Sequence, residues 1–241
     1  MGKEEFLASV RRSLGRSAGP PEAIYPPLEQ TAEVLDGQVR EMRRHLEERL
    51  PQIIDRLAQV AEMQGWHVHR AVDPEEAIAA VLSIAGSLGI QNAVRTNQDV
   101  FDEIPLDIGA SNWGLTITNA SQNELFDRPG VRRSIIDADL GITGADYAVA
   151  ETGSLVIVPR QGLSRLASLV PPVHVAIVRP QDVVETLDHV FLLRRLEYHK
   201  NGGEMGSYLN FITGPSRTAD IEQTLVVGVH GPREAHMVLL G

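Results

Sequence analysis

The sequence contains no cysteine. It therefore cannot form a disulfide bond, use a thiolate as a nucleophile, bind zinc through sulfur, or hold an iron–sulfur cluster with its own cysteine ligands. If the protein takes part in electron transfer, the redox centre has to belong to a partner or to a bound organic cofactor. We therefore expect no cofactor bound by cysteine, and the identity of any organic ligand stays open.

Two further features are lacking, a basic charge excess and a long apolar run. The chain carries 22 Lys and Arg against 32 Asp and Glu, for a formal net charge of −10. Nucleic acids and anionic membranes are bound by clustered basic residues, so we expect neither as a partner. No window approaches the roughly 18 uninterrupted apolar residues of a membrane span. The first residues also lack the apolar core of a signal peptide, which favours a cytoplasmic protein.

The 241 residues, of which 43% are hydrophobic and 22% charged, are typical of a globular protein. Apolar residues at helical spacing predict a helix over 3–14, and two proline pairs then mark a linker. We predict an N-terminal helical arm and linker at 1–27 and one α/β domain at 28–241. The arm is either a loosely packed helix or a partner-binding segment.

Apolar periodicity predicts strands that alternate with helices along the rest of the chain. The Gly-containing link between 147–150 and 155–158 is typical of a hairpin. We therefore predict an α/β fold with a mainly parallel sheet, flanking helices and an antiparallel insertion. Helices are expected at 31–63 (divided or kinked at Pro51), 73–88, 123–126, 131–138 and 181–198, and strands at 66–70, 92–96, 115–119, 147–150, 155–158, 173–178, 211–213, 225–229 and 237–240.

The first of two polar, glycine-rich segments covers residues 141–154. Its glycines suit tight turns or close approach to a ligand, and the nearby hydroxyls and amides suit an anion. The alternative is a hairpin turn whose hydroxyls only cap the backbone. A nucleophilic role for the Glu151 carboxylate is a further alternative. The candidate ligand-binding residues here are Thr143, Gly144, Glu151, Thr152 and Gly153.

The second segment begins at residue 211 and includes Ser216, Arg217 and Thr218 just past a predicted strand. A guanidinium binds carboxylates and phosphates in a bidentate way, so Arg217 is a candidate anion contact. An internal ion pair of Arg217 with Asp220 or Glu222 is the alternative. The candidate ligand-binding residues of this segment are Ser216, Arg217, Thr218, Asp220 and His230. His230 follows the next strand, either as a hydrogen-bonded structural residue or as an acid–base group. Because ligands bind at the carboxyl ends of strands in open α/β sheets, we expect one small-molecule site at these loops.

A metal site is poorly supported by the sequence. His67 and His69 lie on the same face of a predicted strand, but no third ligand can be identified. The chain has no HExxH, no Walker motif, no GxGxxG and no GxSxG elbow. We therefore predict no metal and assign no catalytic residue.

Three stretches, 145–155, 214–222 and 228–232, together resemble the LUD domain family, in the lactate-utilization protein C group. The resemblance spans roughly 31–241. It implies a NagB/RpiA/CoA-transferase-like fold and a role in bacterial oxidation of L-lactate to pyruvate, beside two companion proteins that carry iron–sulfur clusters. The signature positions, to which the resemblance assigns no chemical role, are Glu151, Thr152, Gly153, Ser216, Arg217, Thr218, Asp220 and His230.

Three functions remain open at this stage. The leading hypothesis is a non-redox subunit of a lactate-oxidising complex, which binds a small carboxylate or phosphate-bearing ligand at the two segments. The second is an autonomous acyl- or CoA-transferring or sugar-phosphate enzyme, which rests on fold analogy. The third is a structural assembly factor that docks through residues 1–27 and the charged helix at 38–56.

Overall fold

A computed structural model of the protein describes residues 2–15, 30–120, 128–160, 163, 165–206, 208–219 and 225–241. The α-helices are α1 (Lys3–Ser13), α2 (Ala32–Glu48), α3 (Leu50–Gln64), α4 (Pro74–Ser87), α5 (Val100–Glu103), α6 (Leu106–Ser111), α7 (Arg128–Ile136) and α8 (Leu187–Lys200). The strands are β1 (His67–Ala71), β2 (Asn92–Arg95), β3 (Thr116–Asn119), β4 (Leu140–Gly144), β5 (Tyr147–Val149), β6 (Ser154–Ile157), β7 (Val173–Val178), β8 (Val183–Val184), β9 (Asn210–Ile212), β10 (Arg217–Ala219), β11 (Leu225–Val227) and β12 (Glu234–Leu240). The helix predicted at 123–126 and most of the predicted linker lie outside the described residues.

The main sheet has six strands in the order β1-β12-β7-β4-β2-β3, and all of its pairings are parallel. The apolar run at 173–178 forms the central strand β7, which is buried along its whole length. Such runs are typical of strands that are covered on both faces. The predicted α/β fold with a mainly parallel sheet is thereby confirmed.

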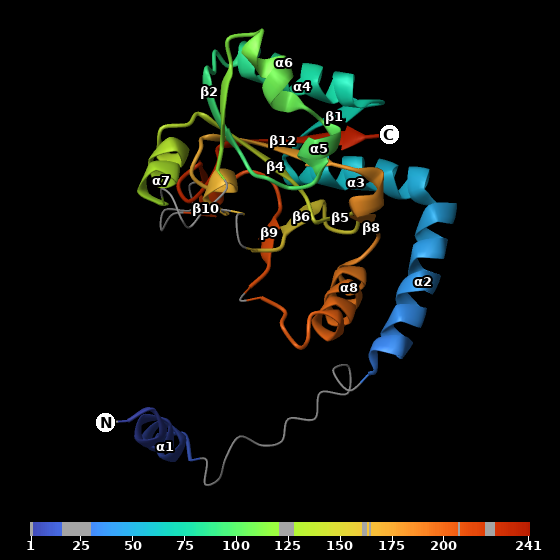
Figure 1. Ribbon diagram of the computed structural model, residues 1–241, viewed down its shortest axis with the longest axis vertical. Helices are drawn as coiled ribbons and strands as arrows, with labels where there is room; N and C mark the ends of the chain where they lie inside the picture. Colours follow the sequence, from blue (N-terminus) through green and yellow to red (C-terminus); the bar gives the residue numbers. More distant parts are fainter. Residues whose placement is uncertain are drawn as a thin grey trace.

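Two layers cover the main sheet (Figure 1). The helices α4, α5 and α6 pack on one face around Val81, Ile104 and Leu106. Helix α3 and a smaller sheet pack on the opposite face, where α2 and α8 complete the core. After each strand of the main sheet, the chain turns toward one of these two layers. Where neighbouring strands turn toward opposite layers, their loops separate.

The smaller sheet has the order β8-β5-β6-β9. Strands β5 and β6 form the predicted antiparallel hairpin, and β6 is also antiparallel to β9. Because both β5 and β9 run opposite to β6, their carboxyl ends lie at the same edge. Strands β10 and β11 form a separate two-stranded sheet.

Local sequence signals set the helix boundaries. The Asp73 carboxylate accepts the N–H of Glu76, and the Glu76 carboxylate accepts the N–H of Val72, at 2.8 and 2.9 Å. Asp73 therefore caps the helix, and Glu76 reaches back to the residue before the cap, much as in a capping box. Pro51 lies in the first turn of α3, where its missing N–H costs nothing, so the long apolar pattern divides into α2 and α3. Gly65, at a φ of 93°, ends α3.

The hairpin turn between β5 and β6 is docked against α3 and the start of β1. The indole N–H of Trp66 donates to the carbonyl of Gly153 at 3.0 Å. A Cβ at position 153 would lie 2.8 Å from the Cα of Ala61, so only glycine allows this approach. Gly153 also adopts a φ of 65°, which other residues reach at a cost.

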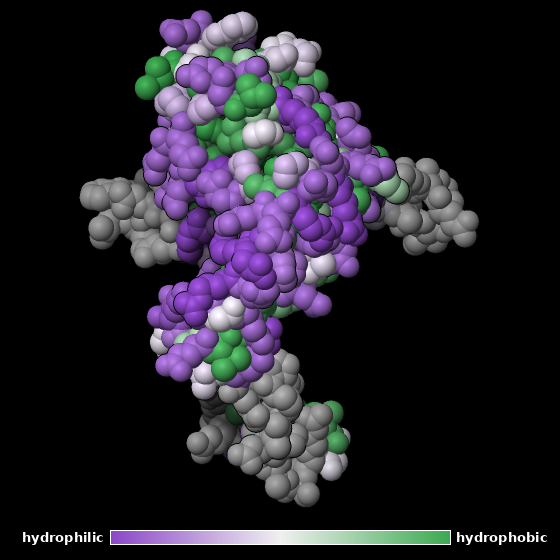
Figure 2. Space-filling model, turned by 90° about the vertical axis from the view of Figure 1, so that its right-hand side faces the viewer, coloured by the Kyte–Doolittle hydropathy of each residue, from purple (hydrophilic) through white to green (hydrophobic). Residues whose placement is uncertain are grey.

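Two surface features accompany this core. Helix α2 turns a charged side to solvent, where Arg44 pairs with Glu41 and Glu48, and Figure 2 shows that this side of the molecule is largely hydrophilic. Helix α1 is present as predicted, and its apolar side chains Phe6 and Val10 are exposed. Across the described parts of the chain, no helix is long and apolar enough to cross a membrane.

The Trp66–Gly153 contact predicts a measurable loss of stability in Trp66→Phe. Phenylalanine keeps an aromatic ring but leaves the buried Gly153 carbonyl without its donor, so we expect the free energy of unfolding to fall by about 1–3 kcal/mol. Urea denaturation measures the change. Trp113→Phe is the matched control, because Trp113 is 74% exposed while Trp66 is 3% exposed. Equal effects of the two variants would contradict this account.

Candidate functional site

The two predicted segments meet at one edge of the smaller sheet, in a cleft of about 610 Å³ that we call the turn cleft. The hydroxyls of Ser154 and Thr213 lie 2.7 Å apart and join the two segments directly. The structure thus brings part of each segment together, and a shared ligand site at this point stays a prediction. The strand ends involved belong to the smaller sheet, whereas ligands of open α/β folds bind beside the main parallel sheet. The turn cleft is lined by Gln64, Glu151, Thr152, Ser154, Leu187, Phe191, Phe211 and Thr213.

The predicted residues of the hairpin turn have three different environments. The Glu151 carboxylate accepts the N–H of Leu187 at 3.1 Å, so it caps the first turn of α8. The hydroxyl of Thr152 is buried and has no hydrogen-bond partner among the described residues. Gly153 is committed to Trp66 through its carbonyl. Of the three, Thr152 is the residue with a buried polar side-chain atom that has no partner among the described residues.

Arg217 lies beside the turn cleft and is held by the end of α3. Its Nη2 donates to the carbonyl of Gln64 at 2.9 Å. A Cβ at position 65 would overlap this guanidinium, so the glycine that ends α3 also makes room for Arg217. The alternative partner Asp220 lies outside the described residues. Thr218 pairs with Val226 across β10 and β11 and does not line the cleft.

Ser216 and His230 contact each other away from the turn cleft. The Ser216 hydroxyl accepts the N–H of His230 at 3.2 Å, and the Ser216 N–H donates to Pro232. His230 is exposed and precedes β12, so the pair lies toward the amino ends of the parallel strands. These contacts organise the loop before β12.

Thr143 and Gly144 belong to the main sheet and not to the turn cleft. Thr143 is fully buried, with its hydroxyl 2.9 Å from Nε2 of His174. The N–H of Gly144 donates to Oε1 of Gln98 at 2.7 Å. Gly144 ends β4 and so lies at the carboxyl edge of the parallel sheet, beside the polar side chain of Gln98.

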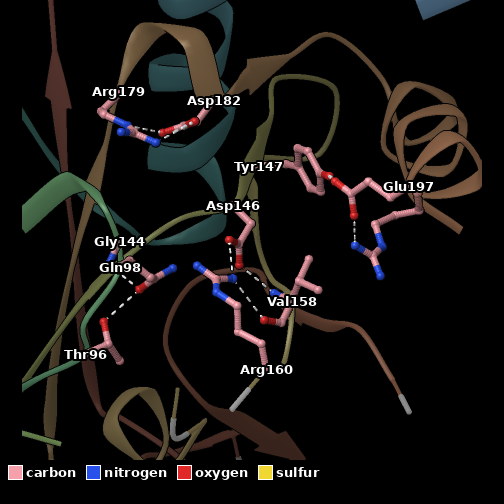
Figure 3. Close-up of polar contacts among 11 residues, drawn as sticks. Thr96, Gln98, Gly144, Asp146, Tyr147, Val158, Arg160, Arg179, Asp182 and Glu197 are labelled. Carbon is pink, nitrogen blue, oxygen red and sulfur yellow. Dashed lines mark hydrogen bonds and ion pairs between the residues drawn. The ribbon is translucent and has the colours of Figure 1, made fainter. Parts of the chain in front are cut away.

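The residues at this carboxyl edge were missed by sequence reasoning. Figure 3 shows them with their hydrogen bonds. The Thr96 hydroxyl donates to Oε1 of Gln98 at 2.7 Å. The Asp146 carboxylate accepts from Arg160 at 2.7 Å and from the N–H of Val158 at 2.6 Å. The sequence signal for two of them is that Thr96 ends the predicted strand at 92–96 and Gln98 comes just after it.

Further charged groups flank this edge. Arg179 binds Asp182 and Glu103, each at 2.7 Å. The hydroxyl of Tyr147 donates to Glu197 at 2.7 Å. Burial, followed by the Glu197 carboxylate, raises the pKa of Tyr147 well above its ordinary range, so this phenol stays protonated.

A cavity of about 490 Å³ lies between the smaller sheet and α8. This volume is within the range of small-molecule pockets, about 300–1,000 Å³. Arginines and carboxylates alternate around it, so no single sign of charge prevails. It is lined by Arg43, Asp146, Tyr147, Val158, Pro159, Arg160, Leu193, Arg194, Glu197, Asn201, Glu204, Met205 and Gly206.

The histidines that drew attention in the sequence lie beside a third one. Nε2 of His69 is 3.0 Å from Nδ1 of His236, and the His67 ring also faces His236. Nε2 of His236 contacts Glu234 at 3.0 Å, so both ring nitrogens of His236 have protein partners. Among the residues that the structure describes, no group of three or more histidine or acidic side chains has the arrangement of a metal site.

A family model described as the LUD domain matches residues 54–240. This chain belongs to the LUD domain family. The resemblance drawn from the two glycine-rich segments is thereby confirmed. The match begins inside α3 and includes the main sheet, the smaller sheet and the turn cleft.

The relatives of the chain include proteins that it matches over nearly their whole length and a longer protein that it matches over half of its length. Lactate utilization protein C of Halalkalibacterium halodurans is 32% identical over 99% of this chain and 97% of that protein. Lactate utilization protein C 1 of Bacillus mycoides is 31% identical over 98% of this chain and 96% of that protein. Lactate utilization protein B of Shouchella clausii is 25% identical over 83% of this chain, which spans 50% of that protein. A DUF162 family protein of Deinococcus radiodurans, known from a crystal structure, shows 22% identity, 80% coverage of this chain, 98% of that chain and a TM-score of 0.49.

The burial of His174 beside Thr143 predicts a pH-dependent stability. Burial, aided by the charge of His236, lowers the pKa of His174 to about 3. In the unfolded chain this histidine takes up a proton near pH ~6.5, whereas in the folded chain it stays neutral until about pH 3. The free energy of unfolding therefore falls as the pH drops below ~6.5. Between pH ~7.5 and ~5 this histidine should remove about 2 kcal/mol from the free energy of unfolding.

The measurement compares urea denaturation of the wild type with that of His174→Gln, which keeps a polar partner for Thr143. The variant should lack this part of the pH dependence, whereas His45→Gln, at an exposed position on α2, should retain it. An unchanged pH dependence in His174→Gln would show that folding does not shift the pKa of this histidine.

Proposed function

We propose that this protein is a non-redox component of bacterial lactate utilization, which acts in the oxidation of L-lactate to pyruvate together with companion proteins that hold iron–sulfur clusters. The oxidation removes two electrons and two protons from lactate. The electrons pass to clusters on the companions, because a chain without cysteine supplies no thiolate ligands for a cluster. The observation that carries the proposal is similarity over 99% of the chain to a lactate utilization protein C.

The turn cleft supports the binding of a small carboxylate in this role. The hydroxyls of Thr152, Ser154 and Thr213 supply hydrogen-bond donors, and Arg217 adds a fixed cation beside them. The buried Thr152 hydroxyl gains most from a ligand, because an unpaired buried polar group is costly. Phe191 and Phe211 form an apolar wall that fits the carbon skeleton of a small organic acid.

Growth on L-lactate tests the proposal. A strain of Halalkalibacterium halodurans that lacks its lactate utilization protein C should recover growth on L-lactate when it produces this chain. Affinity capture of the tagged chain under anaerobic conditions should recover cysteine-rich proteins that contain iron. Failure to restore growth, with the chain present and folded, would contradict the proposed function.

The role of the turn cleft is tested separately by two substitutions. Thr152→Val keeps the shape and removes the hydroxyl, and Arg217→Ala removes the cation. Each should slow growth on L-lactate, because losing one charge-assisted or buried hydrogen bond weakens binding of the ligand about tenfold. Thr116→Val and Arg233→Ala are the matched controls at exposed positions. If the cleft variants grow like the controls, the ligand does not bind at the turn cleft.

A further inference from the structure

The carboxyl edge of the main sheet contains a topological switch point between β2 and β4. The connection that leaves β2 enters α5, whose Val100 and Phe101 pack in the core on the α4–α6 side. The connection that leaves the neighbouring strand β4 enters β5, whose Tyr147 and Val149 pack in the core on the opposite face. Loops that leave adjacent strands toward opposite faces separate and open a crevice, and ligands of open α/β sheets bind there.

Gln98 lies at this switch point, which we call the carboxyl-edge crevice, and one of its polar atoms has no partner among the described residues. Its residue is 4% exposed, and its Oε1 accepts from both Gly144 and Thr96. The N–H of Gly144 can only donate, which fixes Oε1 as its partner and settles the orientation of the amide. The other atom, Nε2, is buried and has no hydrogen-bond partner among the described residues. An unpaired buried donor destabilises the fold, which a ligand acceptor relieves.

At the carboxyl-edge crevice, both Asp146 oxygens already accept hydrogen bonds, whereas the Gln98 amide nitrogen has no acceptor among the described residues. Asp146 uses one oxygen on Arg160 and the other on Val158. Figure 3 shows the Gln98 amide nitrogen pointing toward Asp146 and the guanidinium of Arg160. Arg160 also lines the cavity of about 490 Å³, so the crevice and this cavity share a wall. A ligand bound here has to supply acceptor atoms.

We propose that this carboxyl-edge crevice is a second ligand site, separate from the turn cleft. It takes a small molecule whose carboxylate or phosphate oxygen accepts from Nε2 of Gln98 and contacts Arg160, and whose body extends into the adjoining cavity. The two sites have no lining residue in common. The inference does not rest on a role in lactate oxidation.

Side-chain amide NMR of the ¹⁵N-labelled full chain tests the site, with pyruvate as the carboxylate probe and inorganic phosphate as the phosphate probe. The resonance of Gln98 is assigned by its absence in Gln98→Glu, which keeps an acceptor for Gly144 but removes the donor. Saturable movement of this resonance with either probe supports the site, and the probe that moves it identifies the head group. Thr152→Val, in the turn cleft, should leave this movement unchanged.

Two variants and a control decide the assignment. Gln98→Glu and Arg160→Gln should each weaken binding of the active probe at least about tenfold, because each removes a donor to the ligand. Binding is followed by the Gln98 resonance in Arg160→Gln and by the backbone amide resonance of Gly144, the partner of residue 98, in Gln98→Glu. Gln91→Glu makes the same chemical change at an exposed position near the amino end of β2 and should bind normally. Arg160→Gln carries the test if Gln98→Glu fails to fold, since Arg160 is half-exposed. Absence of any Gln98 movement with both probes at millimolar concentration, or equal binding by the variants, would overturn the proposal.

Discussion

The docking of one hairpin turn on one helix is the constraint on which the rest of the structure depends. The turn between β5 and β6 reaches α3 because Gly153 carries no side chain and because Trp66 donates to its carbonyl. This contact holds the hairpin of the smaller sheet against α3, and the pairing of β6 with β9 places Ser154 next to Thr213. The hairpin contributes residues both to the core against α3 and to the lining of the turn cleft, so both depend on this contact.

The same docking separates the two candidate sites. Because β5 packs on the α3 side of the main sheet and α5 packs on the opposite side, the loop that follows β4 separates from the loop that follows β2. The parting leaves Gln98 at the carboxyl edge, where Gly144 and Thr96 satisfy only its oxygen. The turn cleft joins hydroxyls with an aromatic wall, whereas the carboxyl-edge crevice joins amide and guanidinium donors. Two such sites suit a protein that brings a small acid into contact with other components of an oxidising system.

The sequence predicts well those features that depend on neighbouring residues. The helix that begins at Asp73, the break at Pro51 and the strand at 173–178 follow from short-range rules, and all three are confirmed. The hairpin around Gly153 follows from the same kind of rule. The N-terminal boundary of the domain near residue 28 stays a prediction.

The site was predicted only in part, because its assembly depends on strand order. Thr143 reads as a loop hydroxyl in the sequence, yet its strand lies at the centre of the sheet and buries it against His174. Gln98 gives no signal until β2 and β4 are known to be neighbours. His236, which is far from His69 in the chain, becomes its neighbour through the pairing of β1 and β12. Each of these outcomes is set by tertiary pairing, which periodicity does not specify.

The central claim, that the protein supports lactate oxidation without a redox centre of its own, is tested most directly by anaerobic reconstitution. The purified chain is mixed with the iron–sulfur companion proteins and L-lactate, and pyruvate is measured with an artificial electron acceptor present. The account predicts pyruvate formation only when the chain and the companions are combined. Equal pyruvate formation by the companions without the chain, or by the chain alone, would contradict it.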